Sequence, residues 1–182
     1  MKISEILNSI FFPRKTEYNS DEKDYLVHVD KNVNVGIRMF IASNNSPTIL
    51  FFHANAEITH EYDDIAQMYN KYNINFIVSG YRGYGLSNGQ PSMDTSLEDS
   101  LKIFDFVLDH LKSLKNKNHL VVMGRSLGST SASHLMLKRE QEIDGAIIDS
   151  GFATEYPFLL RFGLDPEEIN FSLSDGFDNL KL

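Results

Sequence analysis

The clearest chemical pattern in the chain is a G-x-S-x-G motif, which consists of Gly124, Arg125, Ser126, Leu127 and Gly128. The apolar run "HLVVMG" precedes the serine, and the small residues of "STSASHLML" follow it at helical spacing. A serine between a buried strand and a helix sits on a sharp turn that exposes its hydroxyl, and the flanking glycines keep side chains out of that turn. The motif therefore predicts that Ser126 is a catalytic nucleophile rather than a serine that only caps a helix.

A nucleophile of this kind also needs hydrogen-bond donors for the negative oxygen that forms during acyl transfer. The backbone N–H of Leu127, at the start of the following helix, is the first expected donor. The segment "HANAE" follows another buried strand, and the backbone N–H of Asn55 in that segment is the expected second donor. The alternative is that His53 and Asn55 only satisfy backbone groups of their own loop.

A serine hydroxyl also needs a base, and the six histidines offer no obvious one. His119 begins its strand and so lies at the opposite edge of a parallel sheet from Ser126. His134 lies further along the helix, about 12 Å from Ser126 at 1.5 Å per residue. His53 and His60 lie at the correct edge, and each is a candidate for an improvised base, although loop packing and helix capping are the favoured roles.

The charged residues near the motif have structural roles as their favoured interpretation. Asp149 ends a strand at the same edge and is a candidate acid, but capping of the following turn is favoured. Arg82 is expected to tie down its glycine-rich loop rather than bind a substrate carboxylate. Glu57, Asp63 and Asp64 are interpreted as charges at a helix N-terminus. No cluster has metal-ligand spacing, so neither a metal nor a cofactor is expected.

Strands and helices alternate along the chain. Residues 24–30 and 33–42 are predicted to form a hairpin, and the apolar runs at 47–53, 74–80, 119–124 and 144–151 are predicted strands. Helices are predicted at 60–72, 96–114 and 129–139. This order predicts an α/β fold with a mostly parallel sheet and helices on both faces.

The chain is predicted to contain one α/β domain at residues 24–182, preceded by an amphipathic segment at residues 1–23. That segment is expected to dock on the domain; a membrane-surface anchor is the alternative, disfavoured because the polar face is not rich in lysine. Residues 152–171 are the only candidate lid, and their apolar side chains fit either an acyl group or a cover for the sheet. The apolar face of the first segment consists of Ile3, Ile6, Leu7, Ile10 and Phe11, and that of the lid includes Phe152, Tyr156, Phe158, Leu159 and Leu160.

Composition limits the possible partners. The net charge of −8 argues against nucleic acid as a partner, because binding phosphates requires a basic surface. No stretch reaches the roughly 18 apolar residues of a membrane helix, so membrane contact is not expected. The chain has no cysteine, which fits a reducing compartment, and a cytoplasmic location is expected.

Four segments in order, "FFHANAEITHEYDDIA", "SGYRGYGLSNGQPS", "VMGRSLGST" and "IIDSGFAT", are similar to the Bem46-like branch of the α/β-hydrolase superfamily. The resemblance covers roughly residues 24–178. It implies a serine hydrolase acting on small-molecule esters or thioesters, with Ser126 as nucleophile and Leu127 and Asn55 as oxyanion donors. It also implies the strand order 1-2-4-3-5-6-7-8. Relatives usually have glycine where this chain has Ala54, and the extra Cβ is expected to tilt the second donor.

The resemblance also implies what this chain lacks. In such hydrolases the acid follows strand 7 and the histidine follows strand 8, and "GFDNLKL" resembles the segment just before strand 7. We therefore expect a sheet truncated after strand 6 and an impaired site without its Asp and His. Residues 145–149 would then form an uncovered apolar edge, so the chain is expected either to form a homodimer there or to be a fragment of a longer product. The alternative function is a non-catalytic pseudo-hydrolase that binds a partner or an acyl ligand.

Overall fold

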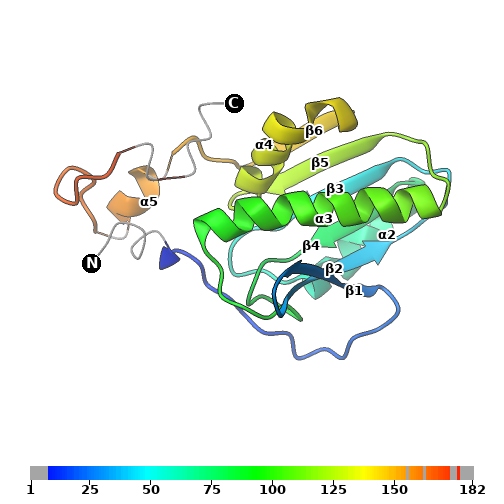
Figure 1. The fold of residues 1–182 in the computed structure, drawn as a ribbon, viewed down its shortest axis with the longest axis horizontal. Helices are drawn as coiled ribbons and strands as arrows, with labels where there is room; N and C mark the ends of the chain where they lie inside the picture. The colour runs from blue at the N-terminus through cyan, green and yellow to red at the C-terminus, as the bar shows by residue number, and fades with distance from the viewer. Residues whose placement is uncertain (1–7, 155, 162, 173–175, 177–182) are drawn as a thin grey trace.

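Six strands form one sheet in the order β1-β2-β4-β3-β5-β6 (Figure 1). The computed structural model describes residues 8–154, 156–161, 163–172 and 176. β2 is antiparallel to β1 and β4, whereas β4, β3, β5 and β6 are parallel to one another. The predicted α/β class is thereby confirmed, and the strand order agrees with the first six positions implied by the resemblance.

The elements occur close to their predicted positions. Residues 31–32 connect the first two strands as a hairpin, with Asn32 in the left-handed region at a φ of 61°. The strands are β1 (Asp24–Asp30), β2 (Val33–Phe40), β3 (Thr48–Phe52), β4 (Asn75–Ser79), β5 (Leu120–Arg125) and β6 (Gly145–Asp149). The helices are the 3₁₀ helices η1 (Thr59–Tyr62) and η2 (Glu140–Glu142) and the α-helices α2 (Asp63–Lys71), α3 (Met93–Ser113), α4 (Gly128–Arg139) and α5 (Tyr156–Arg161).

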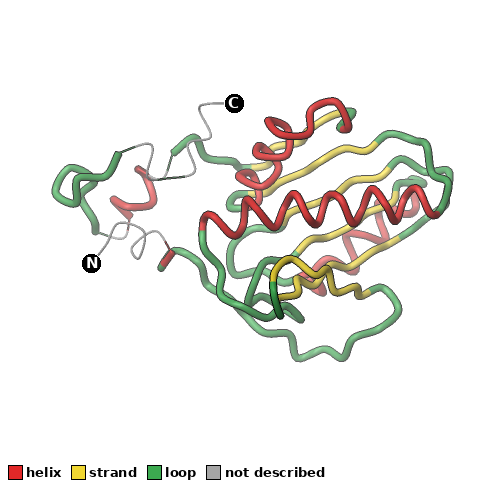
Figure 2. Tube along the Cα trace, viewed as in Figure 1, coloured by secondary structure: helices red, strands yellow, loops and turns green. Residues whose placement is uncertain are grey.

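Helices cover both faces of the sheet, and an apolar cluster lies on each side. Because side chains alternate along a strand, Leu50 and Phe52 of β3 join the cluster under α3 and α4. Ile49 and Phe51 of the same strand point the other way and join the cluster under η1 and α2. Figure 2 shows α3 and α4 on one side of the yellow strands and α2 on the other. The sheet is therefore the middle layer of three, with helices packed on both of its faces.

The helix α2 shows that a sequence pattern can identify a helix without identifying its buried side. Ile65, Met68 and Tyr72, whose spacing predicts this helix, are exposed to solvent in the structure. Ala66 is completely buried and Tyr69 stacks on Phe76 of β4 with ring centroids 4.4 Å apart. The packing face therefore begins one position later than the apolar stripe of the sequence.

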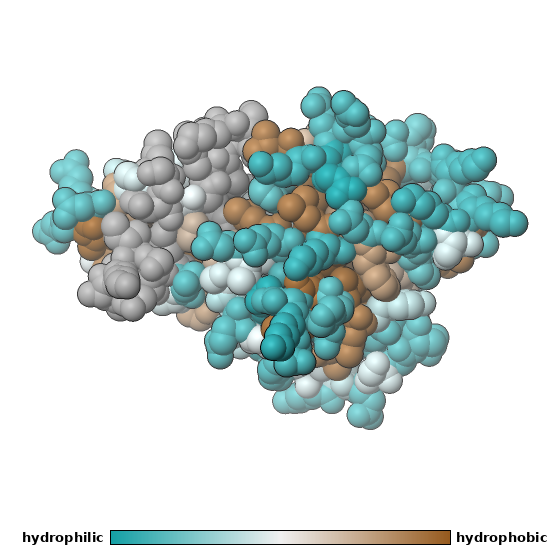
Figure 3. Space-filling view, viewed as in Figure 1, coloured by the Kyte–Doolittle hydropathy of each residue, from teal (hydrophilic) through white to brown (hydrophobic). Residues whose placement is uncertain are grey.

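The strand β6 forms an edge of the sheet and pairs only with β5 in the part of the chain that the structure describes. Its side chains Ile147 and Ile148 are 43% and 49% exposed. For comparison, hydrophilic residues cover most of the described surface on the side of the molecule seen in Figure 3, and apolar residues lie between them. Among the described residues, β6 therefore forms the apolar edge that the sequence predicts.

The amphipathic helix predicted near the N-terminus falls mainly on residues 1–7, which lie outside the described residues, as do Ile3, Ile6 and Leu7 themselves. The part that is described docks on the domain, because Phe11 is buried against Tyr81, Tyr84 and Leu127. Lys15 forms a parallel bridge with Gly85. No helix in residues 8–154, 156–161 and 163–172 is long and apolar enough to cross a bilayer.

The predicted lid contains the short helix α5. Leu159 of this helix is buried together with Phe171, and Met93 at the start of α3 packs against them. Tyr156 and Leu160 are exposed, and Phe152 packs against the cluster around Leu127. The side chain of Phe158 lies outside the described part. The segment therefore has its own small core beside the N-terminal end of α3.

Candidate active site

Ser126 lies on a sharp turn between β5 and α4, as the motif predicts. Its φ is 49°, in the left-handed region that side-chain-bearing residues rarely adopt. Its backbone N–H donates to the carbonyl of Asp149 at 2.9 Å, and its carbonyl accepts from the N–H of Ser129 at 2.9 Å. The turn is therefore fixed on both sides. The Ser126 hydroxyl is partly exposed and has no hydrogen-bond partner among the described residues.

Two glycines make this turn possible. A Cβ on Gly124 would lie 2.2 Å from the carbonyl oxygen of Gly128, and a Cβ on Gly128 would lie 2.0 Å from the carbonyl oxygen of Phe52. Real Cβ atoms never approach backbone oxygens so closely. The start of α4 therefore rests directly on the end of β3 and on the strand that carries Ser126.

The two expected oxyanion donors, the amides of Leu127 and Asn55, follow neighbouring strands. Phe52 of β3 pairs with Gly124 of β5, so the loop after β3 and the turn at Ser126 begin at the same level, about 4.8 Å apart. In the described structure neither the N–H of Leu127 nor that of Asn55 donates to a protein acceptor. Leu127 also lies at the N-terminus of α4, where the helix dipole favours negative charge. Both amides thus remain able to bind an anionic oxygen.

The side chain of Asn55 has a separate, structural role. Its amide nitrogen donates to the carbonyl of Ile10, and its Oδ1 accepts from the N–H of Phe12 at 3.0 Å and from the Tyr84 hydroxyl at 2.6 Å. Burial raises the pKa of Tyr84 to about 12, so this hydroxyl stays a donor at neutral pH. The side chain of Asn55 therefore attaches the N-terminal segment to the loop, while its backbone N–H remains unused.

Ala54, at the position where the resemblance implies glycine, does not adopt a left-handed backbone. Ala54 is not among the residues with positive φ, so its Cβ needs no unusual backbone. The left-handed position in this loop belongs to Ala56, whose φ is 62°. The expected tilt of the loop at Ala54 therefore has no basis in backbone strain at that residue.

His53 is not placed to act as a base for Ser126. The ring is completely buried, and its Nδ1 lies 2.7 Å from the carbonyl oxygen of Ala54. Burial lowers the pKa of His53 despite the opposing effect of that hydrogen bond and of nearby Glu57. Tyr81 covers the ring edge to face at 4.9 Å, and its hydroxyl donates to the His53 carbonyl at 2.7 Å. The histidine packs the base of the loop, which is the favoured interpretation from the sequence.

His60 is directed toward the other end of the sheet. Its Nε2 lies 3.3 Å from Asp24 of β1, and its ring stacks on Tyr18 at 5.4 Å. β1 and β5 are separated by β2, β4 and β3, which places Asp24 about 19 Å from the serine strand. His119 pairs with Asp144 at 3.1 Å at the amino ends of β5 and β6, as expected. None of these three described histidines reaches Ser126.

The sequence interpretation of Glu57 as a charge for a helix dipole is incomplete. Its carboxylate accepts the N–H of Ala54 at 2.8 Å and the hydroxyl of Tyr62, and it lies 3.3 Å from the guanidinium of Arg125. Burial, followed by the hydrogen bond to Glu57, raises the pKa of Tyr62. The only sequence signal for this network is the position of Arg125 next to Ser126, because its partner lies 68 residues away.

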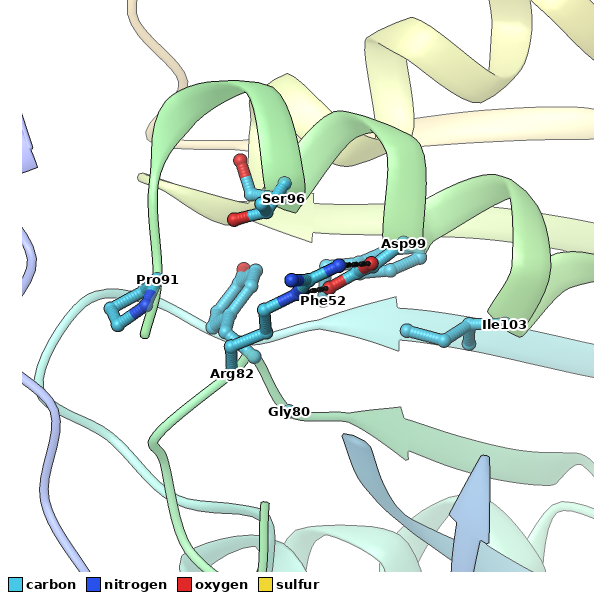
Figure 4. A pocket seen from close by; sticks show the side chains of 9 residues that line it. Phe52, Gly80, Arg82, Pro91, Ser96, Asp99 and Ile103 are labelled. Carbon is cyan, nitrogen blue, oxygen red and sulfur yellow. Dashed lines mark hydrogen bonds and ion pairs between the residues drawn. The ribbon is translucent and has the colours of Figure 1, made fainter. Parts of the chain in front are cut away.

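Asp149 and Arg82 have the structural roles that the sequence favours. Asp149 accepts from the hydroxyl of Ser150 at 2.9 Å, in the turn after β6. Arg82 forms a buried two-point ion pair with Asp99 of α3 at 2.7 and 2.8 Å, shown as dashed lines in Figure 4. The pair lines a cavity of only about 10 Å³, together with Ser96. Arg82 therefore fastens its loop to α3 rather than presenting a charge to a substrate.

Comparison with known proteins matches residues 43–159 to the family described as Serine aminopeptidase, S33. The chain is 28% identical over 146 residues to Protein bem46 of Schizosaccharomyces pombe, covering 78% of this chain and 48% of that protein. It is 32% identical over 138 residues to Lysophosphatidylserine lipase ABHD12 of Xenopus tropicalis, covering 69% and 34%. The Pyrococcus furiosus esterase Pf2001 superposes with a TM-score of 0.64 at 20% identity, over 92% of this chain and 67% of that one. The chain thus spans half or less of these two curated relatives.

Proposed function

This chain belongs to the Bem46-like branch of the α/β-hydrolase superfamily, and from that premise we propose that it carries the nucleophile half of a serine hydrolase site for carboxylic esters or thioesters. The observation that supports this most directly is the turn at Ser126. It combines a strained, partly exposed serine with two neighbouring amides that have no acceptor among the described residues. A serine that only capped a helix would need neither the strain nor the open amides.

The proposed reaction begins with attack of the Ser126 oxygen on the acyl carbon of the substrate. The carbonyl electron pair moves onto the oxygen, which the N–H groups of Leu127 and Asn55 then stabilise. The alcohol or thiol leaves, the acyl group remains on the serine, and water releases it as a carboxylic acid. The serine proton must pass to a base, and His53, His60 and His119 are not in position to accept it. We therefore expect slow turnover, at the level of about 10³–10⁴-fold over water that binding and an oxyanion hole can provide.

Esters and thioesters fit this site better than amides. An alkoxide or thiolate can leave without a positioned acid more readily than an amine can, and no such acid is present among the described residues. The names of the relatives point the same way, since they include a lysophosphatidylserine lipase and an esterase, although the family description names an aminopeptidase. The proposed substrate is accordingly a small-molecule ester or thioester.

The second candidate is a pseudo-hydrolase that binds an acyl ligand or a partner without turnover. It is favoured by the same buried His53 and remote His60 that leave the serine without a base. The two candidates differ in one respect: only the first requires chemistry at Ser126.

Hydrolysis of p-nitrophenyl acetate distinguishes them. We expect the chain to release p-nitrophenol slowly but above buffer, and Ser126→Ala to abolish this excess because the nucleophile is lost. Ser133→Ala, a substitution further along the same helix, serves as the control and should leave the rate unchanged. Equal rates for the chain and Ser126→Ala would refute the nucleophile. Rapid turnover that depends on Ser126 would instead contradict the expectation that the chain lacks an effective base.

A further inference from the structure

The loop that carries the Asn55 amide is held from within by Glu57. One carboxylate oxygen of Glu57 accepts the N–H of Ala54 at 2.8 Å and the hydroxyl of Tyr62. Ala54 immediately precedes Asn55, so this bond fixes the peptide next to the one that carries the unused Asn55 N–H. The side chain of Glu57 is only 25% exposed, so its bonds are partly shielded from water.

The same carboxylate connects the loop to the serine turn. Its other oxygen lies 3.3 Å from the guanidinium of Arg125, the residue immediately before Ser126. Arg125 also lies 3.6 Å from the carboxylate of Asp149, whose carbonyl accepts the N–H of Ser126. Arg125, at the end of β5, thus connects Glu57 in the loop after β3 with Asp149 at the end of β6.

We propose that Glu57 and Arg125 form a clasp that sets the position of the Asn55 N–H relative to Ser126. Both act as positioning residues, because they work through the loop and the turn and not through contact with the substrate. This inference rests on the proposed function of Ser126. The position of the Asn55 N–H affects the reaction only if an acyl substrate on Ser126 forms an oxyanion that this N–H can stabilise.

The positioning role and a role in stability predict effects of different size when the clasp is removed. The side chain of Arg125 is 47% exposed, and an ion pair in such surroundings contributes little to the stability of a fold. A displacement of about 1 Å at a reacting centre, by contrast, can cost about 100-fold in rate. Loss of the clasp should therefore change the reactivity of Ser126 much more than the stability of the chain.

The test is the rate at which a fluorophosphonate probe labels Ser126 in the full 182-residue chain, followed by intact mass. At saturating probe, Glu57→Ala and Arg125→Ala should each label about tenfold more slowly, with a half-saturating probe concentration changed less than about threefold. Glu57→Gln keeps one acceptor oxygen for the N–H of Ala54 but turns an NH₂ donor toward Arg125, so it should label about as slowly as Arg125→Ala. The double variant should be no slower than Glu57→Ala, because both remove one clasp.

Asp109→Ala removes a carboxylate from an exposed ion pair on α3 and serves as the matched control; it should label at the rate of the unmodified chain. Arg125→Ala leaves the bonds of Glu57 to the loop intact, so it tests the proposal even if Glu57→Ala does not fold. Labelling of both single variants at the unmodified rate would overturn the proposal.

Amide hydrogen exchange of residues 54–57 gives a second readout that does not depend on chemistry at the serine. Both single variants should speed this exchange, and Asp109→Ala should not. If the unmodified chain is not labelled at Ser126, the proposed function fails, and exchange still decides whether the clasp holds the loop. Unchanged exchange in both variants would then overturn the clasp, and faster exchange would support it.

Discussion

Two residues of the site, Ser126 and Ala56, adopt left-handed backbone conformations with φ values of 49° and 62°. Such conformations cost a side-chain-bearing residue about 1–3 kcal/mol, so the surrounding structure must impose them. At Ser126 the strain accompanies a partly exposed hydroxyl, which the proposed chemistry uses. At Ala56 the side chain is only a methyl group, so we infer that the strain there belongs to the shape of the loop alone.

This difference predicts that Ala56→Gly stabilises the protein. Glycine removes a left-handed cost of about 1–2 kcal/mol and adds back about 0.5–1 kcal/mol of chain entropy, leaving a net gain of about 0.5–1 kcal/mol in the free energy of unfolding. Urea denaturation measures this change. Ala132→Gly, in the buried interior of α4, is the control and should destabilise by about 1 kcal/mol. A loss of stability in Ala56→Gly would show that the loop does not require a left-handed residue there.

Gly128→Ala is expected to destabilise severely. The new Cβ would lie 2.0 Å from the carbonyl oxygen of Phe52, which is backbone and cannot rotate away. Moving α4 off the sheet should cost about 3 kcal/mol or more, seen as a lower urea midpoint or as failure to fold. Gly145→Ala on β6 is the matched control, because its nearest neighbour would be a Val121 methyl at 3.8 Å, and it should change stability by less than about 0.5 kcal/mol.

At the scale of elements, the alternation of apolar runs was enough to predict the strands β1 to β6 and the helices α3 and α4. The side of α2 that packs was not predictable, because Ile65 and Met68 satisfy the helical spacing as well as Ala66 and Tyr69 do. The spacing of apolar residues indicates that a helix has two different faces, but tertiary packing decides which of those faces is buried. The Glu57–Arg125 pair was missed for a similar reason, since only the parallel pairing of β3 and β5 brings these residues together.

The exposed edge of β6 predicts self-association. An apolar strand with unpaired backbone groups is a template for another strand, so we expect the chain to sediment as a dimer at micromolar concentration. Ile148→Lys should shift it to the monomer, because the charge would be buried in the new interface. Leu26→Lys introduces the same charge at a 57% exposed position on β1, the opposite edge strand, and should leave the dimer intact. A monomeric unmodified chain would contradict pairing through β6.

For the whole molecule, buried or half-buried histidines and paired carboxylates predict that acid lowers stability in two stages. Burial lowers the pKa of three histidines in the folded state, so below about pH 6.5 the unfolded chain takes up protons that the folded chain does not. The free energy of unfolding should therefore fall as the pH drops through about 6.5. The histidines are His53, His110 and His134.

The second stage should begin below about pH 4, where carboxylates with lowered folded pKa values lose the hydrogen bonds and ion pairs that favour their charged form. These carboxylates are Asp21, Asp30, Glu142 and Asp144. Urea denaturation from pH 8 to pH 3 measures both stages. His53→Gln should reduce the slope of the first stage only; an unchanged slope between about pH 6.5 and 5 would show that this histidine is not held neutral in the folded state.

The contact between Gly128 and the carbonyl of Phe52 also limits how the molecule can move. Because there is no room for even a Cβ between them, the beginning of α4 and the end of β3 must move together as one rigid unit. Ser126 and the first residues of the loop after β3 are attached to this unit and move with it. The surface that these residues offer to the proposed ester or thioester is therefore fixed by the fold. The N-terminal segment around Phe11 and the region around α5 pack against this frame from outside, through clusters of their own. Any adjustment of the proposed site to the size of a substrate must therefore come from such outer segments and not from the frame.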